Sequence, residues 1–293
     1  MNTGAPAAST APARLVACTA FALVAFAANS VLCRLALGAE QSDPAAFTGV
    51  RLLSGALVLW LITLRRRRRA QNSAAHHWAA AFLLFAYAAT FSFAYIGLGA
   101  GTGALILFGS VQATMLLAAL GAGERPRPRQ WLGLGLALAG LVYLVSPGLT
   151  APPILESMLM TLAGISWGAY SVRGRGNADP LADTARNFMR SVPFALGLVL
   201  VMAGSLHASE RGVLLATCSG AIASALGYVA WYASLRHLSG TQAATVQLVV
   251  PVLAAAGGIV FLAETISLRF VLAALLILGG VALAVRARRK AAT

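Results

Sequence analysis

The feature that most constrains this chain is a succession of ten apolar runs, most of them about as long as a helix that crosses a bilayer. Hydrophobic residues make up 59% of the 293 residues, and charged residues only 10%. No soluble fold needs so many apolar runs, so we expect an all-α polytopic membrane protein. The expected spans are 15–37, 45–64, 78–97, 102–122, 131–145, 155–172, 184–203, 213–235, 240–262 and 270–285.

The end of the chain repeats an earlier part of it. The segment 247–285 aligns without a gap on the residues 140 positions before it, so that Glu124 matches Glu264 and Arg129 matches Arg269. Each copy contains five spans, which is an odd number, so the second copy must cross the membrane in the opposite direction. The sequence therefore predicts ten transmembrane helices as two inverted five-helix repeats around a central cavity, an architecture typical of alternating-access transporters.

Domain boundaries follow from this repeat. We expect a disordered cytoplasmic tail over residues 1–13, a first repeat over 14–146, a connecting loop over 147–154, a second repeat over 155–286 and a basic cytoplasmic tail over 287–293. The apolar runs are too many for a secretory signal and a single anchor, so we expect no cleaved leader.

The distribution of basic residues predicts the topology. With the N-terminus in the cytoplasm, 17 of the 22 lysines and arginines fall on the cytoplasmic side, including the block 65–69. The positive-inside rule then places both termini in the cytoplasm. The block 65–69 is also of a kind that binds RNA or anionic lipid. We interpret it as a topology anchor and expect no nucleic-acid partner.

Catalytic and metal-binding patterns do not occur in the spans. The sequence contains no HExxH pattern, no P-loop and no pair of intramembrane aspartates, so we expect no enzymatic activity. Cys18, Cys33 and Cys218 lie in apolar runs without CxxC spacing, which predicts free thiols and no metal or other cofactor. All eight acidic residues lie at span ends or in loops. A proton-driven antiporter commonly carries a carboxylate at membrane depth, so we expect facilitated movement of a solute.

Three residues stand out inside the spans by their chemistry. Arg51 and Arg190 are the cations furthest from a span end, where a charge is unfavourable unless it is paired or reaches an interface. Two interpretations are open. One is contact with a substrate carboxylate or a gate; the other, which we favour, is structural, with the side chain either packed against carbonyls at a helix end or snorkelling to the headgroups. Pro251, in the middle of the ninth run, is expected to kink its helix, either as a gate hinge or as a static bend.

Polar and aromatic side chains inside the spans are the candidates for substrate contact. A buried amide or hydroxyl in lipid needs a partner, which a cavity with water or substrate supplies and helix–helix hydrogen bonding supplies as well. Six aromatic residues form a cluster on the third and eighth spans, as either a cavity lining or an interfacial belt: Tyr87, Phe91, Tyr95, Tyr228, Trp231 and Tyr232. The first three share one helix face. The candidate substrate-binding residues are Asn29, Tyr95, Gln112, Trp167, Tyr170, Gln242 and Gln247.

The chain resembles a known family. An acid after the fourth helix of each copy, Glu124 and Glu264, together with Pro251 and Gly280, is similar to the EamA-type members of the drug/metabolite transporter superfamily. The first copy departs from this pattern, with Val111 where the second has Pro251. The resemblance covers nearly the whole chain and implies a ten-helix basket, whose central cavity is lined mainly by the first, third, fourth, sixth, eighth and ninth helices. Within the family, the chain is most similar to the YddG-type exporters of aromatic and other neutral amino acids.

These features together lead to a functional expectation. We expect an amino-acid exporter of the bacterial inner membrane that acts as a monomer and rocks or gates one half against the other. Its expected partners are amino acids and the lipid bilayer. Export of another small metabolite or a drug is the second interpretation, and a membrane-embedded enzyme or channel is the third.

Overall fold

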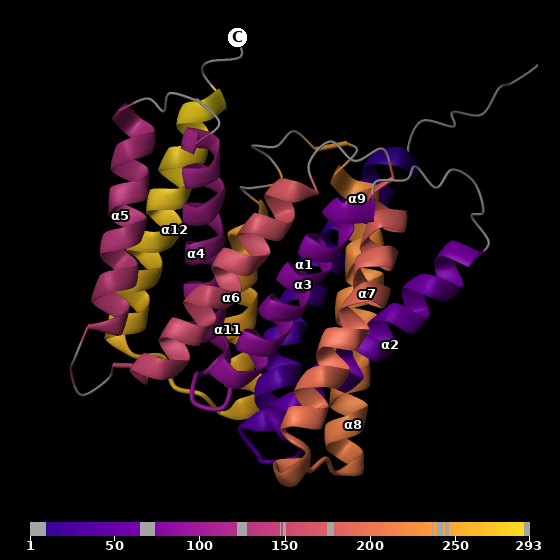
Figure 1. Cartoon of the computed structure of the whole chain (residues 1–293). Coiled ribbons are helices and arrows are strands. Elements are labelled where there is room, and N and C mark those ends of the chain that lie inside the picture. Colours follow the sequence, from indigo (N-terminus) through magenta and orange to yellow (C-terminus); the bar gives the residue numbers. More distant parts are fainter. Residues whose placement is uncertain are drawn as a thin grey trace, which may run out of the picture.

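The computed structural model describes residues 10–64, 74–121, 128–146, 148, 151–174, 179–235, 237–238, 243 and 246–289 (Figure 1). These ranges are helical, with short connections, and they contain no strand apart from an isolated antiparallel bridge between Ser42 and Ala208. Helices form because a chain surrounded by lipid has no water with which to satisfy its backbone hydrogen bonds.

Five helices form the first half of the chain and follow the expected spans closely. They are α1 (Thr10–Leu37), α2 (Pro44–Leu64), α3 (Ala74–Ala94), α4 (Ala100–Gly121) and α5 (Pro128–Val145). Asp43 caps α2, because its Oδ1 accepts hydrogen bonds of 2.9 Å from the amides of Ala45 and Ala46. Helix α1 begins ahead of residue 14, where the sequence predicted the first repeat to start, so the end of the expected tail is helical.

The second half has the same order of helical rods, and one of these rods consists of three consecutive elements. Its elements are α6 (Ile154–Arg173), α7 (Pro180–Val201), the short 3₁₀ turn η1 (Ala203–Ser205), α8 (Glu210–Thr217), η2 (Cys218–Leu226), α9 (Gly227–Leu235), α11 (Val249–Leu262) and α12 (Leu268–Arg289). Helices α8, η2 and α9 join without a break and form one rod, which corresponds to the eighth predicted span. The η2 segment is a π-helix, a rare and wider helical turn that occurs frequently at functional sites.

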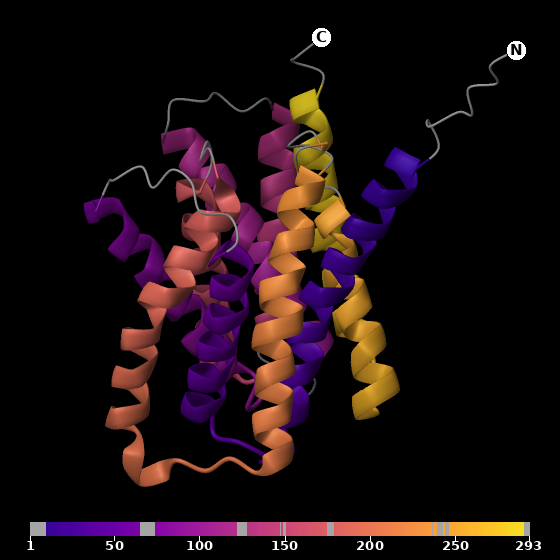
Figure 2. The same ribbon diagram turned by 90° about the vertical axis from the view of Figure 1, so that its right-hand side faces the viewer.

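The two halves run through the bundle in opposite directions. In Figure 1, α1 begins at the upper end and α5 finishes at the lower end, whereas α6 begins at the lower end and α12 finishes at the upper end. Figure 2 likewise shows the start of α1 and the finish of α12 at the same end. The lower end is formed by the connections 38–43, 95–99, 202–209 and 263–267.

Helix packing follows the same internal two-fold relation. Helix α2 packs against α7, α4 against α11 and α5 against α12, and each partner is the counterpart of the other in the opposite half. Helix α3 packs against α6, as α1 packs against the α8–η2–α9 rod. Because these contacts run between the halves, the two halves form one interlocked bundle.

The outward faces of the helices are apolar. Val201 is 83% exposed and Val260 73% exposed, and many other large hydrophobic side chains are similarly uncovered, an arrangement that suits lipid and not water. In the described ranges, five helices are long and apolar enough to cross a membrane: Ala13–Leu37, Pro44–Leu64, Ala100–Gly121, Pro128–Val145 and Glu210–Leu235. Shorter apolar helices are Trp78–Ala94, Val249–Leu262 and Leu268–Ala284.

The ninth predicted span has an irregular residue close to its proline. The sequence predicted a helix over 240–262 with a kink at Pro251, and in the structure Pro251 lies in the first turn of α11, which begins at Val249. Leu248 forms a turn just before it, and Gln247 is helical again. Pro251 has no N–H to donate to the carbonyl of Gln247, so the regular helix is interrupted just before the proline.

Glycines bring α5 and α12 into backbone contact. A Cβ added at Gly133 would collide with the carbonyl oxygen of Gly280, and a Cβ added at Gly280 would collide with that of Gly133. The nearby Gly135 and Gly279 have no described atom within 4 Å of the same position. Small residues of this kind let helices associate closely in lipid, where no hydrophobic force drives them together.

The backbone contact between α5 and α12 predicts a selective loss of stability. We expect Gly280→Ala to lower the free energy of unfolding by about 1–3 kcal/mol, because the new methyl group overpacks the contact. Gly279→Ala is the matched control, and we expect it to be neutral or to stabilise by about 0.5–1 kcal/mol through helix propensity. Thermal unfolding of the purified protein in detergent measures both. Equal losses in the two variants would contradict the contact.

Candidate functional site

Aromatic side chains from both halves meet in the interior of the bundle. Helices α1 and α3 of the first half and α6, α7 and α9 of the second half contribute them. Neighbouring rings touch in a continuous chain, with centroid separations from 4.7 to 6.5 Å. This ring cluster consists of Phe26, Tyr87, Phe91, Tyr95, Trp167, Tyr170, Phe188, Tyr228, Trp231 and Tyr232.

Trp167 joins the rings of the two halves. Its centroid lies 4.9 Å from that of Tyr87 on α3, and it stacks on Tyr228 of α9 at 5.3 Å with an interplanar angle of 16°. Tyr170 lies on the same helix, with its ring 5.4 Å from Trp167. Two of the predicted substrate-binding residues, Trp167 and Tyr170, therefore lie together where the halves meet.

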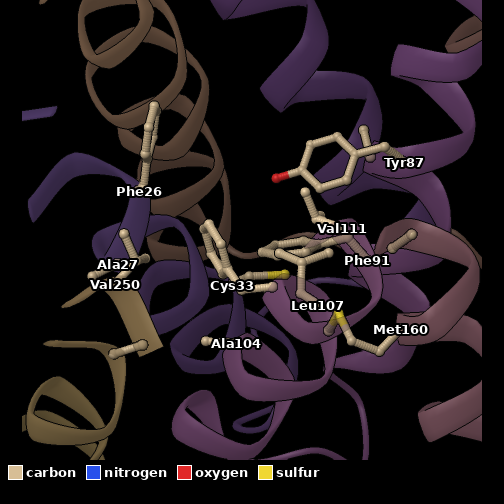
Figure 3. Close-up of a cluster of buried hydrophobic side chains, with 14 of the residues drawn as sticks. Phe26, Ala27, Cys33, Tyr87, Phe91, Ala104, Leu107, Val111, Met160 and Val250 are labelled. Carbon is tan, nitrogen blue, oxygen red and sulfur yellow. The ribbon is translucent and has the colours of Figure 1, made fainter. Parts of the chain in front are cut away.

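The aromatic residues of α3 share one face, as their spacing predicted. Phe91 lies 5.4 Å from Tyr87 and 4.7 Å from Tyr95, the latter pair edge to face. All three side chains are buried, so the interpretation of them as an interfacial belt is wrong. Tyr95 also donates from its hydroxyl to the carbonyl oxygen of Ala100 at 3.3 Å. Figure 3 shows the hydroxyl of Tyr87 pointing away from α3, toward the side of the cluster where Phe26 lies.

Arg51 places a guanidinium against the ring cluster. The residue is 2% exposed, and its Nη2 donates to the hydroxyl of Tyr87 at 3.1 Å. Its Nε donates to Ser224 Oγ at 3.4 Å, and its guanidinium carbon lies 4.9 Å from the ring centroid of Phe91. The expectation that Arg51 snorkels to the headgroups is therefore wrong, because hydroxyls and ring faces hold the side chain inside the bundle.

A hydrogen-bonded chain links Arg51 to α1 through η2. Ser224 Oγ accepts from Arg51 and donates to Asn29 Oδ1 at 3.4 Å, and Ser219 Oγ donates to the same Asn29 oxygen at 2.7 Å. All four side chains are buried. The carbonyl oxygen of Asn29, a predicted substrate-binding residue, is thus engaged within the protein.

Gly220 allows η2 to lie directly on α2. An added Cβ at this position would collide with the carbonyl oxygen of Arg51 and with Ser54 Oγ. Only a residue without a side chain permits this approach, and the approach brings the serines of η2 within reach of Arg51 and Asn29. The π-helical segment η2 of the α8–η2–α9 rod is therefore part of the site.

Other predicted residues have no described contact with the ring cluster. Gln112 on α4 is half-buried, and its Nε2 has no hydrogen-bond partner among the described residues. Gln247 is half-buried just before α11, and Gln242 lies outside the described residues. Arg190 follows Arg51 by 139 residues and so occupies the corresponding place in the second copy, and it lies over the ring of Trp78 at 5.9 Å. The two arginines thus occupy different surroundings although their sequence positions correspond.

Acidic side chains stay away from the middle of the helices. In the part of the chain that the structure describes, they lie in a first helical turn, at a helix cap or in a connection: Glu40, Asp43, Glu156, Asp179, Asp183, Glu210 and Glu264. Glu124 lies outside that part. The described helices therefore hold no carboxylate at membrane depth, and no three potential metal ligands gather among the described residues.

Two connections, one from each half, are tied together at the lower end. Ser42 and Ala208 form the antiparallel bridge, which aligns the connection between α1 and α2 with that between α7 and α8. The amide of His207 donates to Asp43 Oδ2 at 2.8 Å, and the amide of Asp43 donates to the carbonyl oxygen of His207 at 2.9 Å. The cap of α2 is therefore also a contact between the halves.

Glu264 makes a second tie at the lower end. Its carboxylate accepts from the amide of Ala100 at 2.9 and 3.0 Å, which caps α4 of the opposite half. Arg34 Nε lies 3.8 Å from this carboxylate, and Arg34 Nη1 donates to the carbonyl oxygens of Tyr95 and Ile96 at 3.0 and 2.6 Å. We name the contacts of Ser42 with Ala208, Asp43 with His207 and Glu264 with Ala100 the clasp.

Four residues of the site were not among the sequence-based candidates. Ser219 and Ser224 carried a usable signal, since a hydroxyl inside an apolar run needs a partner in lipid. Phe26 and Phe188 carried none, because a phenylalanine in a spanning helix packs equally well against lipid or against other rings.

Comparisons with known proteins agree with this architecture. A family model described as the EamA-like transporter family matches the chain twice, over residues 14–146 and 154–286. A protein of Pseudomonas aeruginosa named "Uncharacterized protein PA1977" is 48% identical over 271 residues, which is 92% of this chain and 94% of that protein. A solved structure titled "Crystal structure of protein" is similar in fold, with a TM-score of 0.65 and 20% identity, and covers 92% of this chain and 97% of that chain.

The bond between Asn29 and Ser219 predicts coupled effects on stability. We expect Asn29→Ala and Ser219→Ala each to lower the free energy of unfolding by about 0.5–1.5 kcal/mol, because each leaves a buried polar group without its partner. The double variant should lose less than the sum of the two, and Ser205→Ala at an exposed position is the control. Thermal unfolding in detergent measures all four variants. Additive losses would show that the two residues act independently.

Proposed function

Because the chain belongs to the EamA-like transporter family, we propose that it exports amino acids, aromatic and other neutral ones, across the bacterial inner membrane by alternating access. In this proposal each of the ten helical rods crosses the bilayer, with its apolar outer face against lipid. The two halves, 14–146 and 155–286, are the units that move, and the protein acts as a monomer. Two family matches, one for each half, support this division.

The ring cluster is the observation that carries the proposed substrate class. A ring of α3 meets one of α6, and a ring of α1 meets two of α9, so the cluster lies between the moving halves, where substrate sites of inverted-repeat transporters are expected. Ring faces accept an apolar or aromatic side chain by offset stacking and an ammonium group by cation–π attraction. An aromatic or other neutral amino acid carries both of these groups.

The charge distribution supports a cytoplasmic upper end. Three arginines, Arg14, Arg129 and Arg173, lie near the upper ends of their helices. The block 65–69 is outside the described residues, and in the sequence it falls between α2, which finishes at the upper end, and α3, which begins there. Basic residues are retained on the cytoplasmic side of membrane proteins. In this orientation the lower end, with the clasp, faces away from the cytoplasm.

The clasp supports a specific conformational step. Contacts between the halves join the connections of the lower end in this structure, so in the proposed mechanism release of an exported solute requires the clasp to open. In an inverted repeat the opposite end is expected to close when this end opens. Because the described helices hold no deep carboxylate, the solute follows its own gradient and needs no proton transfer within the membrane.

Counterflow in proteoliposomes tests the proposed function. We expect saturable uptake of labelled phenylalanine that depends on unlabelled phenylalanine inside the vesicles, with the same rate in the presence and absence of a pH gradient. A labelled organic cation, assayed in parallel, tests the interpretation of drug export. Strong acceleration by the gradient would contradict facilitated movement. Inactivity toward every solute would overturn transport and favour a membrane-embedded enzyme, and unsaturable flux would favour a channel.

A disulfide across the clasp tests alternating access. Opposed residues of an antiparallel bridge have Cα atoms about 4.5–5.5 Å apart, within the range of about 4.4–6.8 Å that a disulfide requires. In a background without the native cysteines, we expect oxidation of the Ser42→Cys/Ala208→Cys pair to stop phenylalanine counterflow and reduction to restore it. Each single cysteine variant is a control that should stay active after oxidation. Full transport by the cross-linked protein would show that the lower end need not open.

A further inference from the structure

Arg51 is, among the described residues, the charged side chain with the least exposure. Only neutral groups hold it, namely the hydroxyl of Tyr87 at 3.1 Å, Ser224 Oγ at 3.4 Å and the ring of Phe91 at 4.9 Å. A guanidinium carries five N–H groups, and these hydrogen bonds use one on Nε and one on Nη2. Nη1 is buried and has no hydrogen-bond partner among the described residues.

No acidic side chain balances this charge in the described part of the chain. The ion pairs there join Arg34 to Glu264 and Arg186 to Asp183, and neither includes Arg51. A full charge removed from water is strongly unfavourable unless an opposite charge pairs with it. Ring faces and hydroxyls offset only part of this penalty. An anion beside Nη1 would supply the missing pairing.

We propose that Arg51 binds the carboxylate of the transported solute, through Nη1 and the remaining N–H of Nη2. The inference rests on the proposed function and names its substrate class: monocarboxylates, zwitterionic or anionic, that carry an aromatic or apolar group. The planar guanidinium matches a carboxylate in a two-pronged geometry. Amines without a carboxylate are rejected, because their positive charge meets that of Arg51 uncompensated.

The neighbours of Arg51 favour a singly charged ligand over a phosphate. Its described partners are neutral, and so are the next side chains outward, Asn29 beyond Ser224 and Trp167 beyond Tyr87. A doubly charged phosphate would need a second cation here. The ring of Trp167 lies 4.9 Å from that of Tyr87, so an aromatic group attached to the bound carboxylate finds a stacking surface within reach.

Direct binding to the purified full chain in detergent tests the inference, with isothermal titration calorimetry as the measurement. Three ligands share a phenyl ring and differ in charge: phenylalanine, 3-phenylpropanoate, which has no amine, and phenethylamine, which has no carboxylate. We expect the two carboxylates to bind at least about tenfold more tightly than phenethylamine, as a charge-assisted pair in a buried site provides.

Substitutions of Arg51 separate binding from a merely structural role. Arg51→Gln removes the charge, and we expect it to weaken 3-phenylpropanoate binding by about tenfold or more while phenethylamine binding stays the same or improves. Arg51→Lys keeps the charge without the planar fork and should give an intermediate affinity. Arg186→Gln, which removes an ion-paired arginine of α7, is the control and should keep the preference for carboxylates. Thermal unfolding verifies that each variant is folded.

Several results would overturn the inference. They are equal affinity of the wild type for 3-phenylpropanoate and phenethylamine, no binding of either carboxylate, and an equal loss of affinity for all three ligands in Arg51→Gln. If neither Arg51 variant folds, chemical modification of the wild-type protein tests the inference instead. The carboxylates, and not phenethylamine, should protect Arg51 from modification by phenylglyoxal, as read by peptide mass spectrometry, and equal modification overturns the inference.

The proposed function fails in a different way. Carboxylate binding through Arg51 without phenylalanine counterflow would support the carboxylate site and contradict amino-acid transport. Phenylalanine counterflow that Arg51→Gln does not change would support amino-acid transport and contradict the carboxylate site.

Discussion

The lipid bilayer offers no hydrogen bonds, and this constraint governs the whole structure. It requires the spanning backbone to be helical, and it requires every polar side chain among the helices to find a partner within the protein. Hydrogen bonds join Asn29, Ser219, Ser224 and Arg51 across three elements, α1, η2 and α2, and leave Nη1 of Arg51 without a partner among the described residues. Polar groups inside such a bundle are therefore concentrated where helices of the two halves meet, which is also where a solute path is expected.

An internally symmetric frame holds an asymmetric site. The helix pairs repeat across the two halves, yet Arg51 lies against buried rings while Arg190 lies over Trp78, a residue 49% exposed. Symmetry of the frame gives a transporter two related conformations with similar energies. In the proposed mechanism, the asymmetry of the side chains gives the shared centre one chemistry, with which both conformations recognise the same solute.

Much of the frame could be predicted from the sequence, and less of the site. Span length and composition predicted the helices to within a few residues, because bilayer thickness fixes both. The disruption next to Pro251 could be predicted because a proline removes one helical hydrogen bond, but whether the helix bends or stops there could not. The orientation of Arg51 was wrong, because snorkelling depends on which neighbours lie beside the side chain, and Ser224 is 173 residues away in sequence. Tyr87, Phe91 and Tyr95 were placed correctly because helical spacing alone determines their common face.

The contact between Gly133 and Gly280 has a mechanical consequence. Where two main chains touch, no layer of flexible side chains lies between them to deform, so α5 and α12 behave as one stiff post along the flank of the bundle. One half cannot slide freely past the other at this seam. Any large displacement of the remaining helices must pivot about the post, and the widest excursions then fall on the opposite flank.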